Sequence, residues 1–150
     1  MHWLHTRWPA GTVEKLPQVD GHGESNISGL YIVGDLTGIP LLKFSADTGA
    51  RAVRHILSDG RFKSGRQEGV LDLAIVGAGV AGMSAALEAR EAGLDFALLE
   101  ATEPFSTLVN FPKGKPIYTY PSEMEPAGQI CFESEVKEPL VAKLKEQTLG

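Results

Sequence analysis

Three glycines have the spacing that allows a polypeptide turn to hold a diphosphate. The sequence Gly77-Ala78-Gly79-Val80-Ala81-Gly82 follows an apolar run at 71–76 and precedes an alanine-rich stretch. In such a turn the first glycine permits a tight bend, the second lets the backbone approach the diphosphate, and the third lets helix and strand pack closely. The N–H groups of Val80 and Ala81, at the start of the next helix, then face the anion. The motif indicates a dinucleotide site.

An acidic residue stands where the ribose of a dinucleotide is bound. Glu100 closes the apolar run 95–99 and lies 18 residues after Gly82. A carboxylate at this distance accepts hydrogen bonds from ribose hydroxyls and repels a 2′-phosphate. The pair of features therefore favours FAD or NAD over NADP. A strand, turn and helix that bind no ligand are the alternative interpretation.

The elements that position these residues are expected to alternate between strand and helix. We predict a buried strand at 71–76, a helix at 80–92 and a strand at 95–99. Residues 101–132 are rich in proline and predict an extended excursion, and a last helix is expected from Pro139 to about Gln147, with Leu140 and Leu144 on one side. The fold class is α/β, a Rossmann-like FAD/NAD(P)-binding unit with three layers and a parallel sheet. A third core strand is missing before residue 150, so the unit is interpreted as part of a longer polypeptide.

The N-terminal third predicts a second strand-helix pair. A strand at Leu30–Val33 ends at Gly34-Asp35, and Ser45 or Asp47 is expected to cap a helix that runs to about residue 57. Residues 58–69 are polar and glycine-rich, which is typical of a linker. The predicted organisation is an arm at 1–57, a linker at 58–69 and the start of a dinucleotide-binding domain at 70–150. Residues 1–20 predict a short hairpin.

The segment 29–35 resembles the second FAD motif of the pyridine nucleotide-disulfide oxidoreductase superfamily, and residues 42–52 resemble the stretch that follows it in thioredoxin-reductase-like flavoproteins. The resemblance implies that the Asp35 carboxylate contacts the ribityl and diphosphate portion of FAD. It also implies that the backbone amides of Phe44 and Ser45 face the pyrimidine edge of the flavin. A helix N-terminus there stabilises negative charge on the reduced ring.

Residues 105–112 resemble the equivalent region of bacillithiol-disulfide-reductase-like flavoproteins, so the resemblance covers about 28–57 and 70–150. In those families the glycine-rich turn precedes the Gly-Asp motif, whereas here Asp35 precedes Gly77. This order indicates either a circular permutation with one shared FAD or the end of one module fused to the start of another.

Composition narrows the function further. A net charge of −5 gives no general attraction to nucleic acid, and no run of the sequence is apolar for long enough to span a membrane or form a signal peptide, so a cytoplasmic protein is expected. The single cysteine, Cys131, excludes an internal dithiol and is expected to be buried. The four histidines lack ligand spacing, so no metal site is predicted.

These features favour the FAD-binding portion of an NAD(P)H-dependent flavoprotein oxidoreductase. The expected cofactor is FAD. NAD(P)H is the expected electron donor, and because the sequence has no second GxGxxG, its site is expected outside this chain, in a missing domain or a homodimer partner. The alternatives are an NAD-binding module and a flavin-binding fragment without turnover.

Overall fold

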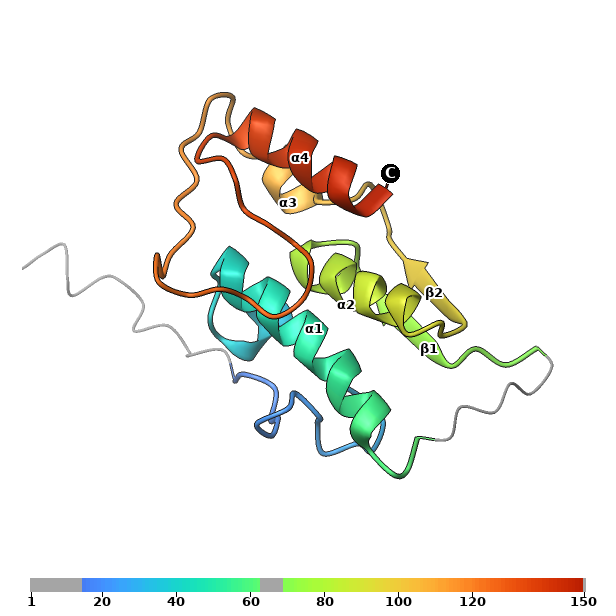
Figure 1. Cartoon of the computed structure of the whole chain (residues 1–150). Helices are drawn as coiled ribbons and strands as arrows, with labels where there is room; N and C mark the ends of the chain where they lie inside the picture. The colour runs from blue at the N-terminus through green and yellow to red at the C-terminus, as the bar shows by residue number, and fades with distance from the viewer. Residues whose placement is uncertain (1–14, 63–68, 150) are drawn as a thin grey trace, which may run out of the picture.

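One helix and two parallel strands form the centre of the fold (Figure 1). The computed structural model describes residues 15–62 and 69–149. Strand β1 (Leu73–Val76) leads through the glycine-rich turn into helix α2 (Val80–Glu91), and strand β2 (Phe96–Leu99) returns alongside β1 with Leu73 opposite Phe96. Ile75 faces α2 and is buried with Ala85, Ala86 and Ala89. The predicted β-α-β unit is therefore confirmed, with each element ending within two residues of its expected bounds.

Helix α1 (Leu42–Ser58) packs along α2 in the same direction, so the two helices begin at the same end of the molecule (Figure 1). Small residues allow the close approach: a Cβ placed on Gly49 would lie 2.1 Å from the carbonyl oxygen of Ala81. The buried Ser84 hydroxyl donates to the Ala46 carbonyl at 2.7 Å. These small residues allow α1 and α2 to pack closely.

Two further helices cover the other flank of α2. Helix α3 (Ser106–Val109) and helix α4 (Lys137–Leu149) contribute Leu108, Leu140 and Leu144 to a core that also contains Phe105 and Met83. The buried positions of Leu140 and Leu144 confirm the predicted face of the last helix, which begins two residues before Pro139.

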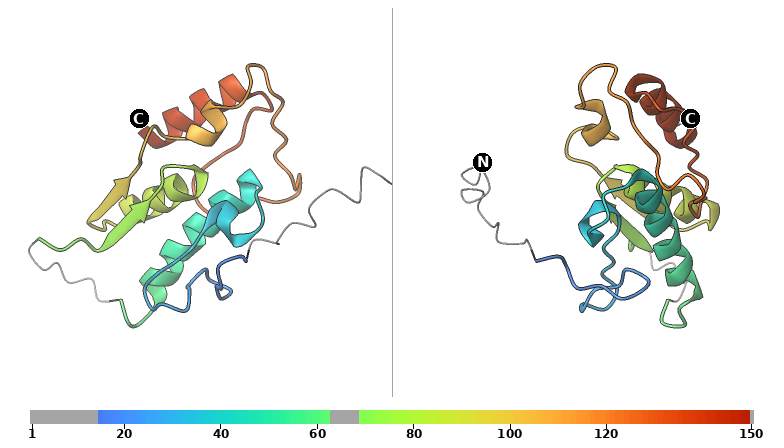
Figure 2. Two further views of the ribbon diagram at one scale, coloured as in Figure 1. Left: turned by 180° about the vertical axis from the view of Figure 1, so that it is seen from behind. Right: turned by 90° about the vertical axis from the view of Figure 1, so that its left-hand side faces the viewer.

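The chain between α3 and α4 runs down to α1 and back, as the orange and red segment of Figure 2 shows. The Lys43 ammonium donates to the carbonyls of Pro121, Ser122 and Met124, and the buried Asp47 carboxylate accepts from the Ala127 amide. Within this excursion the backbone forms one isolated bridge, Pro116 to Val136. The extended excursion is confirmed, and side chains of α1 hold it in place.

The predicted strand at Leu30–Val33 is wrong. Tyr31 forms only an isolated antiparallel bridge with Glu24, and the Ile32 amide donates to the Gly23 carbonyl. A 3-10 helix, η1 (Gly34–Thr37), follows at once. The backbone groups that would pair with a sheet are used by the turn at 23–25, so the segment joins neither β1 nor β2. The arm consists of a turn, η1 and α1.

The predicted start of the first helix is also wrong. Helix α1 begins at Leu42, directly after Pro40-Leu41, and its N-cap residue Leu41 makes no side-chain cap. Proline before a helix start fixes an extended entry without a capping hydroxyl. Ser45 and Asp47 instead lie inside the helix, where both are buried.

The described residues form an α/β fold with two of the three expected layers. Helix α2 covers one face of the two-stranded sheet, whereas Val76 on the opposite face is 84% exposed. Of the predicted linker, 63–68 lie outside the described residues, as does most of the predicted hairpin at 1–20. Among the described residues no helix is both long enough and apolar enough to cross a membrane.

Candidate functional site

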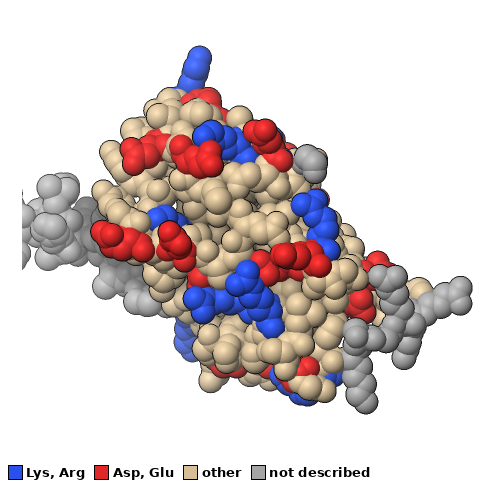
Figure 3. All heavy atoms as spheres, viewed as in Figure 1, with Lys and Arg blue, Asp and Glu red and all other residues tan. Residues whose placement is uncertain are grey.

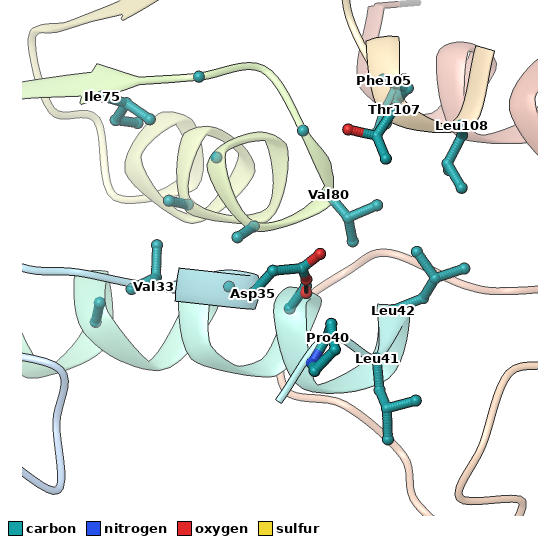
Figure 4. A pocket seen from close by; sticks show the side chains of 18 of the residues that line it. Val33, Asp35, Pro40, Leu41, Leu42, Ile75, Val80, Phe105, Thr107 and Leu108 are labelled. Atoms are coloured by element: carbon teal, nitrogen blue, oxygen red, sulfur yellow. Dashed lines mark hydrogen bonds between the residues drawn. The ribbon is translucent and has the colours of Figure 1, made fainter. Parts of the chain in front are cut away.

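The N-terminal ends of α1 and α2 open onto one cavity of about 710 Å³. Its size lies within the range of about 300–1,000 Å³ that is usual for small-molecule sites. In Figure 4, Asp35 lies near the start of α1 and faces Val80 at the start of α2, with Thr107 and Leu108 of α3 beyond. Most of the residues predicted to bind a cofactor line this cavity: Asp35, Ser45, Gly77, Gly79, Val80, Ala81 and Gly82. Two of them, Phe44 and Glu100, do not.

Each glycine of the turn has the environment that the motif predicts. Gly77 has φ +98°, a conformation that disfavours any other residue. A Cβ on Gly82 would lie 1.9 Å from the Gly77 carbonyl oxygen, so only glycine allows this helix-strand contact. Gly79 has open space around its Cβ position, and α2 starts there without a side-chain cap. The uncapped N–H groups and the free space beside Gly79 fit a diphosphate.

Glu100 fixes the turn from the end of β2. Its carboxylate accepts from the Ala78 amide at 2.8 Å and from the Thr102 amide at 3.0 Å. These two hydrogen bonds, the Ala78 bond first, hold the pKa of Glu100 below its usual range. The charged carboxylate joins the glycine-rich turn to the start of the next loop, where one of its oxygens accepts from both the amide and the hydroxyl of Thr102.

The Gly34-Asp35 motif is anchored on both helices. The Gly34 amide donates to the Thr48 hydroxyl at 3.0 Å, and the Ser45 hydroxyl donates to the Asp35 carboxylate at 2.7 Å. Gly34 has φ +73°, and a Cβ placed on it would lie 2.9 Å from the Cβ of Ala81. Two motifs 43 residues apart, by the difference between positions 34 and 77, therefore meet at one place.

The expected role of the Ser45 amide is corrected. Because α1 begins at Leu42, the Ser45 amide donates to the Leu41 carbonyl inside the helix at 2.9 Å. The N–H groups of the first turn belong instead to Leu42, Lys43 and Phe44, which helix geometry leaves without intrahelical acceptors. Ser45 acts through its hydroxyl, and Thr48 is a site residue that sequence reasoning missed. The signal available in the sequence was a small polar residue, Thr48, one helical turn after Phe44.

The far wall of the cavity comes from the residue just before α3 and from the excursion after α3. It presents aromatic and apolar residues together with one ammonium group: Phe105, Phe111, Lys115, Pro116, Ile117, Tyr118 and Tyr120. The Tyr118 and Tyr120 rings lie 6.0 Å apart at 28°, and the Lys115 ammonium lies 3.7 Å above the Phe111 ring. Spacing gave no signal for this wall, because it depends on how the excursion folds back.

Charges of both signs alternate over the face shown in Figure 3, without a broad patch of either. The starts of α1 and α2 each contribute about half a positive charge at the cavity. Among the described residues that line the cavity, Asp35 and Lys115 are the charged ones.

A separate polar cluster holds the arm against the C-terminal end of α1. Glu24, His55 and Asp59 offer oxygen and nitrogen atoms within 4.8 Å of one another. However, Arg61 pairs with both carboxylates, and His55 stacks on His22 at 3.9 Å. Hydrogen bonds from Arg61 lower the pKa of Asp59 from 3.8 to about 2. We define Glu24, Asp59 and Arg61 as the arm clasp, in which one guanidinium is shared by two carboxylates.

The expected burial of Cys131 is wrong. Its thiol is exposed, donates weakly to the Gln129 carbonyl at 3.7 Å and does not line the cavity. The neighbouring backbone is held by Gln147, whose amide group bonds the Cys131 amide and carbonyl. The side chain therefore stays at the surface.

In a comparison with protein families, residues 72–114 match the model of a FAD binding domain. The matched range contains β1, the glycine-rich turn, α2, β2 and α3. No curated protein and no solved structure matches the chain. The match supports a FAD-binding flavoprotein.

Proposed function

We propose that this chain forms the FAD-binding portion of an NAD(P)H-dependent flavoprotein oxidoreductase, in which both motifs serve one FAD. The observation that carries the proposal is the meeting of Gly34-Asp35 with the glycine-rich turn at one cavity. A fusion of two unrelated modules gives no reason for this contact, whereas a circular permutation requires it. The family match at residues 72–114 supports FAD as the ligand.

In this proposal the diphosphate lies at the start of α2, beside Gly79, and Glu100 accepts from the adenosine ribose. Asp35, oriented by Ser45, takes the ribityl side. The first-turn amides of α1 favour negative charge at the flavin ring. Bound flavin supplies the hydride chemistry, while the protein supplies position and electrostatics. The buried Phe105 and Leu108 give this part of the cavity an apolar lining.

The direct experiment is a titration of the purified protein with FAD, FMN and NAD, followed by calorimetry and by visible absorption. We expect FAD to bind most tightly, because it alone engages both the glycine-rich turn and Asp35. Asp35→Asn should weaken FAD without weakening NAD. Equal affinity for NAD and FAD, or an unchanged affinity in Asp35→Asn, would overturn the shared site.

The electron donor is tested separately. Anaerobic mixing of FAD-loaded protein with NADH or NADPH should bleach the oxidised flavin band if this chain accepts hydride by itself. A band that stays oxidised until a further domain is added would place the donor site outside these 150 residues, as the sequence predicts. Bleaching by dithionite in parallel verifies that the flavin is reducible.

A further inference from the structure

The far wall of the cavity contains an ammonium group that forms no direct ion pair with any described residue. Lys115 lines the cavity, and none of the ion pairs among the described residues involves it. Lys43, the other lysine near the wall, is fully used by three carbonyls. Lys115 is exposed, but an anion inside the mostly apolar cavity beside it is less screened than in bulk water.

The backbone of Lys115 is held by two hydrogen bonds, and its ammonium by one aromatic contact. Its amide donates to the Pro112 carbonyl, its carbonyl accepts from the Lys137 amide, and its ammonium lies over the Phe111 ring. The Lys137 side chain in turn holds the Phe111 carbonyl at 2.6 Å. A preorganised side chain loses little conformational entropy when it binds an anion.

Aromatic surface lies on the same wall. Tyr118 and Tyr120 are 62% and 57% exposed although they line the cavity, and their rings form a stacked pair. The segment is anchored at both ends. The Ile117 amide donates to the Glu135 carbonyl, and the Lys43 ammonium donates to the Pro121 carbonyl. Exposed rings in a fixed wall offer a flat face for stacking.

We propose that Lys115, Tyr118 and Tyr120 bind a planar aromatic anion, the redox partner that meets the flavin in this cavity. The proposal rests on the proposed function, because it assigns the remaining wall of the flavin cavity. The glycine-rich turn takes the anionic diphosphate at one end, and Lys115 takes the carboxylate or other anionic group of the second molecule at the other. Lys113, two positions earlier by sequence, does not line the cavity and is the matched control.

The test uses FAD-loaded protein with benzoate and its neutral isostere benzamide as probes. Binding is measured by calorimetry, and contact with the flavin by the change in its visible spectrum. We expect benzoate to bind more tightly than benzamide. Lys115→Gln should weaken benzoate about tenfold, the loss usual for a charged hydrogen bond, and leave benzamide unchanged. Lys115→Arg should keep the preference, and Lys113→Gln should behave as the unaltered protein.

Several outcomes overturn the proposal. These are equal affinity for the two probes, no binding of either, loss of benzoate in Lys113→Gln as large as in Lys115→Gln, or displacement of benzoate when FAD is added to the cofactor-free protein. The visible spectrum of each sample reports whether FAD is bound, so a failure of this proposal is separate from a failure of FAD binding.

Discussion

Single glycines of this chain have different structural reasons for being glycine. Gly82 is required by a contact with the Gly77 carbonyl, whereas Gly79 faces open space at the start of α2. A side chain at position 79 therefore leaves the packing intact and occupies the place proposed for the diphosphate. A substitution at position 79 therefore tests ligand binding without disturbing the fold.

Gly79→Glu should abolish FAD binding while the protein stays folded. The new carboxylate caps α2 and repels the diphosphate, and the φ of −75° suits any residue. Gly79→Gln is the control of the same size without charge, and it should weaken FAD less. Flavin absorption after gel filtration and a thermal melt measure both effects. Retained FAD in Gly79→Glu would contradict the assignment of the turn.

Gly34→Ala should destabilise the protein more than Gly29→Ala. Both positions have positive φ, which costs an alanine about 1–2 kcal/mol. Only Gly34 places the new Cβ against Ala81, at 2.9 Å, whereas nothing lies within 4 Å at Gly29. Relief of that overlap adds about 1–3 kcal/mol. Chemical denaturation measures the loss of stability in each variant. Equal losses would contradict the contact between Gly34 and Ala81.

At this scale the sequence predicted what local spacing determines. The roles of Gly77 and Gly82 follow from motif and neighbours within a few positions, and the structure confirms them. The contacts of Ser45 with Asp35 and of Thr48 with Gly34 join residues 10 and 14 positions apart. They depend on how η1 folds over α1, for which no periodic pattern exists.

The pair α1 and α2 is the element that brings the two motifs together. Besides its small residues, it contains an ion pair: the Arg54 guanidinium donates two hydrogen bonds to the Glu88 carboxylate, at 2.8 and 2.9 Å. The Glu88 side chain is only 7% exposed. The hydrogen bond from Arg54 to that carboxylate raises the pKa of Arg54, so the guanidinium stays charged at any ordinary pH.

Arg54→Ala should cost about 1.5–3 kcal/mol of stability, because it leaves the Glu88 carboxylate buried without its partner. Arg51→Ala on the same helix is the control. The Arg51 side chain is 68% exposed, and the Asp47 carboxylate keeps its hydrogen bond from the Ala127 amide when Arg51 is removed, so the loss should be at most about 0.5 kcal/mol. Denaturant midpoints of the two variants measure the two losses of stability. Similar losses would show that the pair between Arg54 and Glu88 stabilises the fold no more than the pair between Arg51 and Asp47.

The prediction of the β-α-β unit was confirmed and that of the strand in the arm was wrong, for a physical reason. The β-α-β unit from β1 to β2 has apolar runs and an alanine-rich helix that no neighbouring segment competes for. Leu30–Val33 has the composition of a strand, but the turn at 23–25 takes its hydrogen bonds through Gly23 and Ser25. Strand composition predicts an extended backbone without predicting its partner.

Across the whole molecule the arm clasp ties the turn at 20–31 to the end of α1. Arg61 bonds Glu24, Asp59 and the Ser28 hydroxyl, and Tyr31 packs edge-on to His55. The same turn carries Leu30 and Tyr31 into the cavity wall. Loss of the clasp therefore affects one side of the flavin cavity.

Acid should open the clasp in a defined pH range. A carboxylate whose pKa is lowered by folding adds stability above its ordinary pKa and loses it as the pH falls through the folded value. For Asp59 that range runs from pH 3.8 down to about 2. Thermal melts in this range should fall less steeply in Asp59→Asn than in the unaltered protein. An identical slope would show that Asp59 and Arg61 do not couple to folding.

Two helices that start side by side also point the positive ends of their dipoles at the same small volume. Such ends repel each other, so the fold gains from any anion that sits between them. Sulfate should then raise the melting temperature above its general salting effect, and Gly79→Glu, which brings its own negative charge, should lose that excess. A bound cofactor would stabilise the fold in the same way, through its negative charge. The protein is expected to be least stable in salts whose anions bind most weakly between the two helix starts.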